Sequence, residues 1–564
     1  MKIEQTELPP GWEWSTMEEI ANVVGGGTPK TNDPTNYERG TIPWITPADL
    51  SGYTAKHIAH GARFITQKGL NDSSAKMMPA GTVLFTSRAP IGYVAIASNP
   101  VCTNQGFKSF VLKEGVLPDY VYWWLKGSKD LAESMASGTT FLELSGAKAK
   151  QLPIPVAPLD QQKHIVAEIE KQFSRLDEAV ANLKRVKANL KRYKAAVLKA
   201  AVEGRLVETE AELARREGRS LPTPRPGIFY VYAIRCNDDS IYIGHTDDLA
   251  RRWEEHLAGQ GADWTKQHKP MQIVHYEKYS SRQEAADREK WLKTGYGRKW
   301  IKREIEAGRA RQVGYETGTQ LLQRILETRR QQWLARAEKA GGKGKGKYKE
   351  PATPDTTDLP ELPEGWVWTT YAQIGEVTTG FTPPTADAEN FGGDIPFFKP
   401  TDLDAGDNVV MAREFLSEKG AAKGRLLPAG SVLVTCIGAT IGKTGLARVG
   451  CATNQQINAV SPVQDLAESA FVYSWTVSPS GHKQILDNAS ATTLPILNKS
   501  KFEALPIPLP PLAEQKRIVA ELDRRLSLAC ETEAQVDANL KRAERLHQST
   551  LKTAFIGLLV PQVR

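Results

Sequence analysis

The sequence predicts an α+β protein of several domains, with two β-rich domains that are each followed by a long helix and a small α/β domain between the halves. Three observations lead to this prediction. The chain of 564 residues contains an internal duplication, each copy ends in a stretch with helical apolar spacing, and residues 227–308 have no counterpart elsewhere. A chain of this length can form several independent cores.

The duplication is carried by segments that recur in the same order. LPPGWEWSTMEEIANV returns as LPEGWVWTTYAQIGEV, IPWITPADL as IPFFKPTDL, and LPIPVAPLDQQKHIVAEI as LPIPLPPLAEQKRIVAEL, at 8–23 and 362–377, 42–50 and 395–403, and 152–169 and 505–522. Repeated segments of this length indicate that both halves adopt the same fold. We expect one globular domain at residues 1–158 and the other at residues 359–511.

Short β-branched and aromatic runs bounded by glycine and proline fill both globular domains. GTVLFTS (81–87) and IGYVAIA (91–97) predict strands, and residues 119–131 predict a helix. The LPIP segments are expected to break the chain, because proline continues neither a strand ladder nor a helix interior. Two pairs of tryptophans are interpreted as core anchors rather than base-stacking platforms: Trp12 with Trp14, and Trp366 with Trp368.

A long helix is predicted after each globular domain, at 159–207 and 512–564. In the first helix the heptad ANLKRVK is followed directly by ANLKRYK (188–194). A period of 3.5 residues keeps one apolar face against a partner helix, so the pattern predicts a coiled coil. The alternative is a long surface helix that packs on its own domain. The apolar face is formed by Ile169, Phe173, Leu176, Val180, Leu183, Leu190 and Val197.

Composition and charge exclude several classes of protein. No apolar run is long enough to span a bilayer, and the five cysteines are scattered without a CxxC pair, so we expect a cytoplasmic protein without disulfides or a zinc site. The net charge of +8 indicates a polyanionic partner. The excess of Lys and Arg lies in 159–205 and 309–350, whereas the globular domains are neutral or acidic, which is unlike a non-specific DNA-binding protein.

The repeated motifs LPxGWxW, IPWITPADL, TNQ and LPxPxxPLxxQ resemble those of the specificity subunit of type I restriction–modification systems. The resemblance covers nearly all of 1–220 and 315–564. It implies that each β-rich unit is a target-recognition domain that reads half of a split site in double-stranded DNA. It also implies that the two helices pair as an antiparallel coiled coil. The implied partners are two adenine-methylating modification subunits and the restriction subunits, which use SAM and ATP in place of this chain.

Helix geometry agrees with this resemblance. Residues 159–205, at ~1.5 Å per residue, would extend ~70 Å, roughly two turns of B-DNA at ~35 Å per turn. A rod of this length could separate two DNA-reading domains by an unread spacer. The chain shows no SAM-binding glycine loop, Walker A motif or helicase motif, so methylation and translocation are expected from the partners.

Neither globular domain shows a recognition helix or a metal finger, so loops are expected to read the bases through polar side chains. For TNQ, a structural role is favoured over base reading. The motif occurs in both halves, although the halves should read different bases. A shared motif is expected to shape the fold or contact phosphates. The DNA-binding candidates are Lys30, Thr46, Ser87, Arg88, Asn104 and Gln105 in the first domain, and Lys399, Thr401, Lys443, Asn454 and Gln455 in the second.

The insert at 227–308 predicts a β-β-α-β-α order. IFYVYAIR and IYIG flank a turn rich in Asn and Asp, which predicts a hairpin. TDDLARRWEEHL (246–257) predicts an amphipathic helix and MQIVHYEKY (271–279) a third strand. SRQEAADREKWLKTG (281–295) predicts a second helix that starts with a Ser-x-x-Glu capping box.

The motifs YVY, YIG, RRWEEH and REKWLK resemble, in this order, a GIY-YIG nuclease domain. The resemblance implies that Tyr232 and Tyr242 are the paired motif tyrosines, with Tyr232 the favoured group for activating water. It implies that Arg252 faces the phosphate, that His256 is the helix histidine and that Glu289 binds one Mg²⁺. This set suits phosphodiester hydrolysis, which needs an activated water, a cation and a metal held by a carboxylate.

One departure from the GIY-YIG pattern favours an alternative, a degenerate nuclease kept as a DNA-binding or spacer module. No asparagine follows Glu289 before Asn390, although some members of the superfamily place one near the metal. His245, Cys236 and His268 are interpreted as structural.

The insert lies between a connector at 208–226 and a helix with a basic flexible linker at 309–358.

The two resemblances leave three hypotheses for the function of the chain: a non-catalytic specificity subunit, the same scaffold with a Mg-dependent endonuclease, and a homing-type nuclease.

Overall fold

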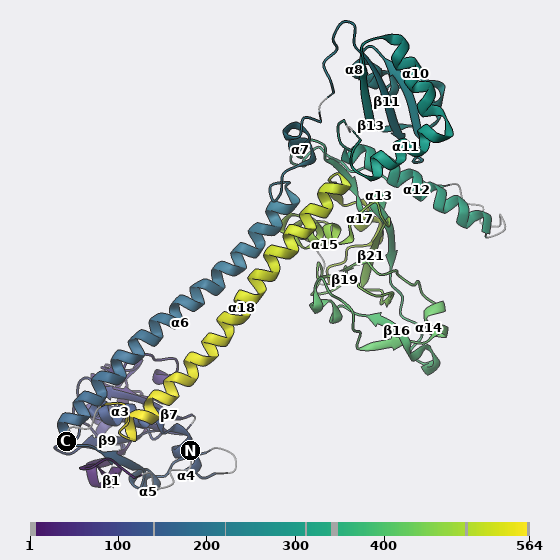
Figure 1. Cartoon of the computed structure of the whole chain (residues 1–564). Helices are drawn as coiled ribbons and strands as arrows, with labels where there is room; N and C mark the ends of the chain where they lie inside the picture. The colour runs from purple at the N-terminus through teal and green to yellow at the C-terminus, as the bar shows by residue number, and fades with distance from the viewer. Residues whose placement is uncertain are drawn as a thin grey trace. The chain divides into compact units, whose positions relative to one another are not determined.

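A computed structural model of the chain describes residues 7–88, 90–138, 142–219, 221–310, 313–339, 348–490 and 494–560. The chain divides into two compact units, Met1–Ala188 with Thr532–Arg564 and Asn189–Glu531, and each is described by itself. Figure 1 shows the elements of both units along the chain. Among the described residues, no helix has the length and apolar character needed to cross a membrane.

The first globular domain belongs to unit 1 and contains three sheets, in the orders β1-β10, β2-β9-β6-β7-β4 and β5-β3-β8. The strands predicted at 81–87 and 91–97 are confirmed as β6 and β7. The elements are β1 (Glu13–Thr16), α1 (Met17–Ile20), β2 (Ala21–Gly25), β3 (Ile42–Ile45), β4 (His57–Ile58), β5 (Arg63–Ile65), α2 (Gln67–Asn71), β6 (Val83–Ser87), β7 (Ile91–Ala97), β8 (Cys102–Thr103), β9 (Lys108–Leu112), α3 (Pro118–Gly127), α4 (Lys129–Met135), α5 (Gly146–Lys150) and β10 (Pro153–Val156).

The second globular domain, in unit 2, repeats this arrangement, with sheets in the orders β14-β22, β15-β21-β18-β19 and β17-β16-β20. Trp14 lies opposite Pro155 in β1 and β10, and Trp368 lies opposite Pro508 in β14 and β22. The duplication therefore extends to strand register. The elements are β14 (Val367–Thr370), α13 (Tyr371–Ile374), β15 (Gly375–Thr379), β16 (Phe391–Phe398), β17 (Glu414–Leu416), α14 (Glu418–Ala422), β18 (Val432–Thr435), β19 (Thr444–Leu446), β20 (Ala452–Thr453), β21 (Ile457–Pro462), α15 (Ser469–Val477), α16 (Pro479–Asp487), α17 (Lys499–Ala504) and β22 (Pro506–Leu509).

The prediction that LPIP breaks the chain is wrong, because both LPIP segments form strands, β10 and β22. Each strand belongs to a two-stranded pair, so one of its edges needs no backbone N–H donor, and alternate prolines can occupy that edge. The carbonyls of Pro153 and Pro155 accept hydrogen bonds from Trp124 Nε1 and Tyr120 Oη at 2.9 and 2.8 Å. Side chains of α3 thereby donate hydrogen bonds to carbonyls of β10 at positions where the prolines have no N–H of their own.

The helix predicted at 119–131 is two helices, α3 and α4. Ser128 separates them with φ −106° and ψ 16°, and its hydroxyl donates to the Trp124 carbonyl at 2.7 Å. A serine hydroxyl that bonds the backbone in this way competes with the helical hydrogen bonds, which accounts for the break.

The two long helices are α6 (Leu159–Val202) and α18 (Leu512–Phe555). The predicted apolar face of α6 is buried or half-buried, whereas Val186 and Tyr193 outside that face are exposed. On α18 the buried residues recur every seven positions, as Leu522, Ala529, Val536 and Ala543. This is the spacing expected for a helix that packs on one partner helix.

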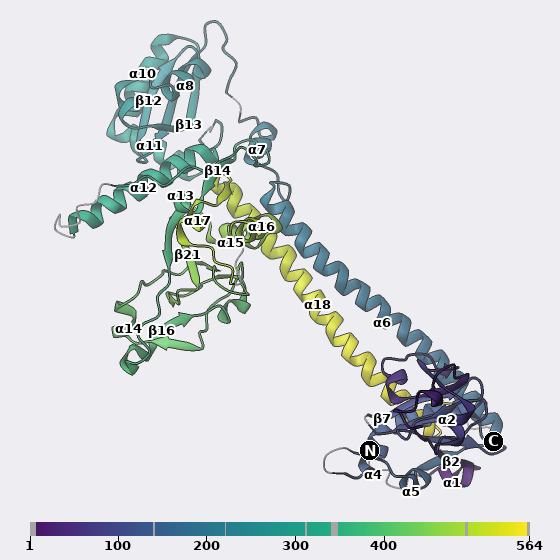
Figure 2. The same cartoon turned by 180° about the vertical axis from the view of Figure 1, so that it is seen from behind.

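Within each unit, segments of α6 and α18 lie side by side (Figures 1 and 2). In unit 1 the ring of Phe173 contacts His547 at 4.5 Å, and Lys187 Nζ pairs with Asp537 at 2.6 Å. In unit 2 the end of α6 and the start of α18 share an apolar cluster that includes Val197 and Ile518. Each globular domain also packs on both helices, as Tyr120 of α3 does on the end of α18.

Two interactions support the interpretation of Trp12 and Trp366 as anchors. Trp12 Nε1 donates to Gln161 at 2.6 Å, and Trp366 Nε1 donates to Glu514 at 2.9 Å. Each tryptophan joins its domain to the first turn of the following long helix, at the same place in both repeats.

The insert folds as a three-stranded antiparallel sheet in the order β12-β11-β13, with helices on both faces. Residues of β11 alternate between the two faces, so Tyr232 and Ile234 pack with Leu249 of α8, whereas Val231 and Ala233 pack with Leu292. The short helix α9 and the helix α11 were not predicted. The elements are β11 (Phe229–Cys236), β12 (Ile241–Thr246), α8 (Leu249–Leu257), α9 (Asp263–Gln267), β13 (Pro270–Tyr279), α10 (Arg282–Lys293) and α11 (Gly295–Glu306).

Two helices flank the insert, α7 (Glu210–Arg216) before it and α12 (Gly318–Lys339) after it. Leu321 and Ile325 of α12 are buried in the core of the second globular domain. The helix predicted in the connector is therefore confirmed. Within the predicted helix and basic flexible linker at 309–358, residues 340–347 lie outside the described part of the chain.

Candidate functional site

The two motif tyrosines of the insert lie on adjacent strands of its sheet. Tyr232 of β11 lies opposite Gly244 of β12, and Tyr242 lies opposite Ile234, so both tyrosines occupy the same face. Their ring centroids are 6.2 Å apart. A Cβ on Gly244 would lie 2.6 Å from the Tyr232 hydroxyl, so only glycine fits there. Glycine in YIG therefore makes room for the tyrosine hydroxyl.

His256 of α8 accepts a hydrogen bond from the Tyr232 hydroxyl. Its Nε2 lies 2.9 Å from that oxygen, and its Nδ1 lies 2.7 Å from Thr265 Oγ1. The Thr265 hydroxyl donates to the Ala262 carbonyl at 2.9 Å, so it must accept from Nδ1–H. This leaves the Nε2 lone pair for Tyr232.

The protonation states of His256 and Tyr232 also make the tyrosine the donor and the histidine the acceptor. Burial, together with Arg252, lowers the pKa of His256 to about 4, so the imidazole is neutral at pH 7. Burial raises the pKa of Tyr232, so its hydroxyl carries the proton that it donates. The pair is a phenol that donates to a neutral base.

Arg252 lies one helical turn before His256 on α8. Its Nε donates to the Tyr232 hydroxyl at 3.3 Å, and its Nη1 pairs with Glu255 at 2.6 Å. A guanidinium beside the Tyr232 oxygen would stabilise the phenolate that forms when the proton moves to His256. The structure therefore brings four of the five predicted catalytic residues together: Tyr232, Tyr242, Arg252 and His256.

Glu289 of α10 is the fifth predicted residue, and its carboxylate contacts two cationic or titratable groups, His245 Nδ1 and Lys293 Nζ. Burial alone would raise the pKa of Glu289, but the hydrogen bonds from Lys293 and His245 lower it. Glu289 is therefore an ionised carboxylate. Its side chain is 15% exposed.

The donor set at Glu289 suits Mg²⁺ better than an ion that needs several protein ligands. Among the described residues no group of three or more His, Cys, Asp or Glu side chains is arranged to bind a metal. Mg²⁺ retains several waters and is often bound by one or two carboxylates, so a single ionised Glu289 fits this ion. Lys293 would have to release one carboxylate oxygen on binding.

Glu289 is positioned by its neighbour on α10, Arg288. The Arg288 guanidinium pairs with both oxygens of Glu277, each at 2.8 Å, and lies 4.3 Å from the ring of Trp291 and 4.7 Å from that of Trp300. A bidentate pair between two aromatic rings restricts the guanidinium to one geometry. This cluster fixes α10, and thereby Glu289, to β13.

Two residues of the site were missed by the sequence reasoning. His245, interpreted as structural, contacts Glu289, and Thr265 determines the tautomer of His256. For His245 the signal was its position directly after YIG, on the strand that carries Tyr242. For Thr265 the sequence offers no signal, because its contact depends on the unpredicted helix α9.

The eleven DNA-binding candidates differ in exposure. Lys30, Gln105, Thr401 and Gln455 are exposed; Thr46, Arg88, Asn104, Lys399 and Lys443 are half-buried; Ser87 and Asn454 are buried. Lys443 and Arg88 already pair with acidic residues, Asp404 at 2.6 Å and Glu143 at 3.7 Å, and Lys399 pairs with Glu414. The Thr46 hydroxyl donates to Asp49 at 2.7 Å, and Ser87 to the Gly106 carbonyl at 3.2 Å. Local contacts therefore occupy these five side chains.

The TNQ segments make the same backbone contacts in both halves. Gly27 N donates to the Thr103 carbonyl at 2.9 Å, and Phe381 N donates to the Thr453 carbonyl at 2.8 Å. A Cβ on Gly26 would lie 1.9 Å from the Asn104 carbonyl oxygen. These contacts support the interpretation that TNQ shapes the fold of both domains.

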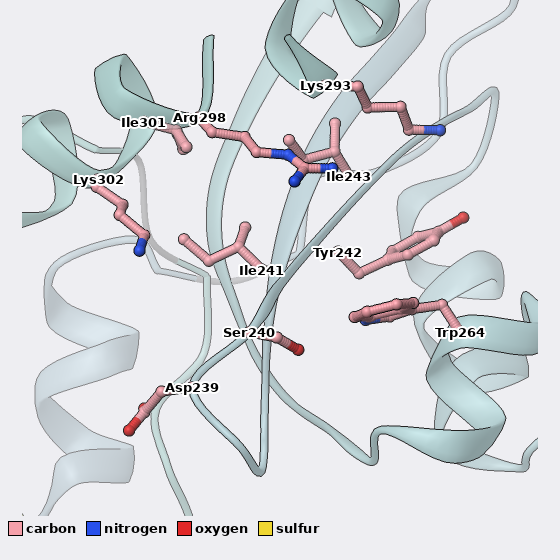
Figure 3. Close-up of a pocket in the computed structure, with 10 residues that line it drawn as sticks. All are labelled: Asp239, Ser240, Ile241, Tyr242, Ile243, Trp264, Lys293, Arg298, Ile301 and Lys302. Carbon is pink, nitrogen blue, oxygen red and sulfur yellow. The ribbon is translucent and has the colours of Figure 1, made fainter. Parts of the chain in front are cut away.

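A pocket of about 470 Å³ opens beside the edge strand β12 of the insert and includes Tyr242 and Lys293, the partner of Glu289 (Figure 3). The site of the insert thus has three parts: the buried hydrogen-bonded pair of Tyr232 and His256, the ionised carboxylate of Glu289, and the adjacent pocket.

Two protein-family models match the chain. The model of the type I restriction modification DNA specificity domain matches residues 9–192 and 363–542, and that of the GIY-YIG catalytic domain matches residues 228–302.

Among curated relatives, the MjaIX type I restriction enzyme specificity subunit of Methanocaldococcus jannaschii is 42% identical over 183 residues, 32% of this chain and 41% of the relative. The EcoR124I/EcoR124II specificity subunit of Escherichia coli is 31% identical over 174 residues, 30% of this chain and 42% of the relative. The chain thus matches about two-fifths of the length of these relatives. A UPF0213 protein of Haloquadratum walsbyi is 45% identical over 65 residues, 12% of this chain and 73% of the relative.

Two solved structures share the fold. A chain from a study of complex assembly and conformational transition of the type I R-M system aligns with a TM-score of 0.57 and 16% identity, over 98% of this chain and 99% of the other. The HsdS subunit from Thermoanaerobacter tengcongensis aligns with a TM-score of 0.50 and 16% identity, over 99% and 100%.

Proposed function

Because this chain belongs to the type I restriction modification DNA specificity family, we propose that it is the sequence-specific DNA-binding subunit of a type I restriction–modification complex. Its two target-recognition domains would each read half of a bipartite site. The observation that supports this most directly is the repeated fold, in which each domain is anchored to a long helix through the same tryptophan contact.

In this proposal α6 and α18 form one antiparallel coiled coil that determines the spacer between the two half-sites. Each helix has 44 residues, which at ~1.5 Å per residue is ~66 Å, about two turns of B-DNA. Two adenine methyltransferase subunits and the restriction subunits would bind to this scaffold and supply the SAM- and ATP-dependent steps.

Replacing residues 359–511 with the second recognition domain of another family member tests the proposal. Methylated positions are mapped in cells that express the hybrid with its modification subunits. One half-site should change, while the other half-site and the spacer stay the same. A change in both halves or in neither would contradict separate reading by the two domains.

The geometry of the insert supports a second function, a Mg²⁺-dependent endonuclease near the target site. Tyr232 has the features of the group that activates water, because it has a neutral base at 2.9 Å and a guanidinium at 3.3 Å. Solvent reaches Tyr242 more easily, because Tyr242 lines the pocket, whereas Tyr232 is 1% exposed. We assign proton removal to Tyr232 with His256 as the acceptor.

The other residues of the insert have separate roles in this proposal. Arg252 stabilises the phenolate and faces the developing charge on the phosphate. Glu289 would hold Mg²⁺, with His245 orienting its carboxylate. When bound, the metal would polarise the phosphate and stabilise its negative charge.

Cleavage by the purified complex, with and without Mg²⁺, tests the nuclease. Tyr232→Phe, Arg252→Ala and Glu289→Ala should each abolish the cleavage that depends on the insert. Arg251→Ala is the matched control, because this arginine is exposed on α8 and pairs only with Asp247 and Glu255 among the described residues. Equal cleavage by all four variants and the unaltered chain would leave the insert without a catalytic role.

A further inference from the structure

The pocket beside β12 has a composition that the proposed hydrolytic chemistry does not use. Its lining includes three isoleucines, Ile241, Ile243 and Ile301, of which the last two are buried, and two aromatic side chains, Tyr242 and Trp264. Figure 3 shows Trp264 next to Tyr242 at one end of the pocket, with Lys302 and Asp239 at the other end. The pocket therefore extends from Tyr242 along the edge strand β12.

The charge of the pocket is positive. Lys293, Arg298 and Lys302 line it, against a single carboxylate, Asp239. Among the described residues, Arg298 and Lys302 form no ion pair, and both are exposed. Two cations without carboxylate partners on one wall of a pocket favour an anionic occupant such as a phosphate group.

Trp264 is held with one face available. Its ring stacks on His268 with centroids 4.1 Å apart and an interplanar angle of 18°, and His268 Nδ1 is 2.8 Å from Asp238. The tryptophan nevertheless remains 47% exposed. An indole that is fixed by stacking on one face is a preformed platform for a second ring on the other face.

We propose that this pocket is a nucleotide-binding subsite that seats one unpaired DNA nucleotide beside the scissile phosphate. Its base stacks on the free face of Trp264, and Arg298 and Lys302 contact its phosphates. A volume of about 470 Å³ accommodates one nucleotide. A base inside a duplex is covered on both faces by its neighbours, so only an unstacked base reaches the indole.

This inference rests on the proposed nuclease function and specifies its substrate: DNA with an unpaired nucleotide at the cleavage position. The specificity domains would then bring the insert to duplex DNA, while the insert itself acts where a strand is displaced or unpaired. Lys293 links the two parts, because it lines the pocket and contacts Glu289.

The test measures binding by the full-length chain in EDTA, which prevents Mg²⁺-dependent cleavage. Fluorescence anisotropy follows a labelled single-stranded oligonucleotide that lacks the recognised site, its duplex form, and competition by thymidine monophosphate. The variants are Trp264→Ala, Trp264→Phe and the double variant Arg298→Ala/Lys302→Ala. Lys278→Ala is the control, because Lys278 is exposed on β13, at the opposite edge of the sheet.

Trp264→Ala should weaken single-strand binding about tenfold, the loss of one stacked base, and Trp264→Phe should restore most of it. The double variant should lower the slope of log K against log salt by about 1.4, at ~0.7 per phosphate contact. Duplex binding and Lys278→Ala should be unchanged.

Three results would overturn the proposal. One is single-strand binding that is unaffected by both Trp264→Ala and the double variant. Another is an equal loss of duplex binding, which would mean a general phosphate contact. A third is monophosphate binding that responds to the variants while oligonucleotide binding does not, which would mean a free nucleotide as ligand. Because no step of this test requires cleavage, an inactive insert and an empty subsite are distinguishable.

Discussion

His256 allows the most detailed prediction, because its hydrogen bonds determine both a protonation state and a chemical role. His256 is 1% exposed, and its two ring nitrogens are bonded to Tyr232 and Thr265. His256→Gln places an amide oxygen near the position of Nε2. The glutamine can accept the hydrogen bond of the Tyr232 hydroxyl but cannot take its proton.

The pKa of His256 determines how stability depends on pH. In the folded chain it lies at about 4, below the usual 6.5, so the unfolded chain binds the proton more tightly. The stability of the insert is therefore complete above pH 6.5 and falls as the pH decreases towards 4. At ~1.4 kcal/mol per pH unit the loss approaches about 3 kcal/mol.

Two assays check this prediction. Amide hydrogen exchange of β11 between pH 7 and pH 4.5 should show a loss of protection in the unaltered chain that is much smaller in His256→Gln. Mg²⁺-dependent cleavage by His256→Gln at pH 7 should fall about 10²- to 10⁴-fold, as expected for a lost general base. Equal pH dependence of exchange in both chains, or unchanged cleavage, would refute the assignment.

Two further predictions concern the same domain. Arg288→Lys should destabilise the insert by about 1–3 kcal/mol in urea unfolding, because lysine cannot form the bidentate pair with Glu277, and an unchanged midpoint would contradict the positioning role. Gly244→Ala should cost about 1–3 kcal/mol through overpacking against the Tyr232 hydroxyl. It should also reduce cleavage, and a variant with full activity would show that the hydroxyl position is not critical.

The sequence predicted those parts of the fold that arise from repetition and periodicity. The apolar spacing of α6 identified its buried face. The LPxGWxW repeat identified the anchors Trp12 and Trp366, whereas Trp14, also predicted as a core anchor, is 38% exposed. These predictions succeeded because local spacing decides which side of a helix is buried. The helix predicted at 119–131 was less accurate, because one serine hydroxyl bond interrupts it at Ser128.

The remaining features depend on contacts between distant residues. In the first LPIP strand, β10, the outer carbonyls accept hydrogen bonds from Trp124 and Tyr120, contacts that no local pattern reveals. The contact of His245 with Glu289 joins a strand and a helix 44 positions apart. The motif resemblance supplied the candidate catalytic residues, but only the structure shows which nitrogen of His256 accepts the hydrogen bond of Tyr232. The pocket beside β12 likewise depends on α9 and α11, neither of which was predicted.

The spacer imposed by the helix pair is the most direct test of the central claim that two reading domains are held at a fixed separation. Removing residues 188–194 of α6 together with 530–536 of α18 keeps the heptad register and shortens both helices by seven residues, ~10 Å. Mapping of methylated positions in cells should then show both half-sites unchanged and the spacer shorter by about 3 base pairs, at ~3.4 Å per base pair. A spacer of unchanged length, or half-sites of altered sequence, would contradict the account.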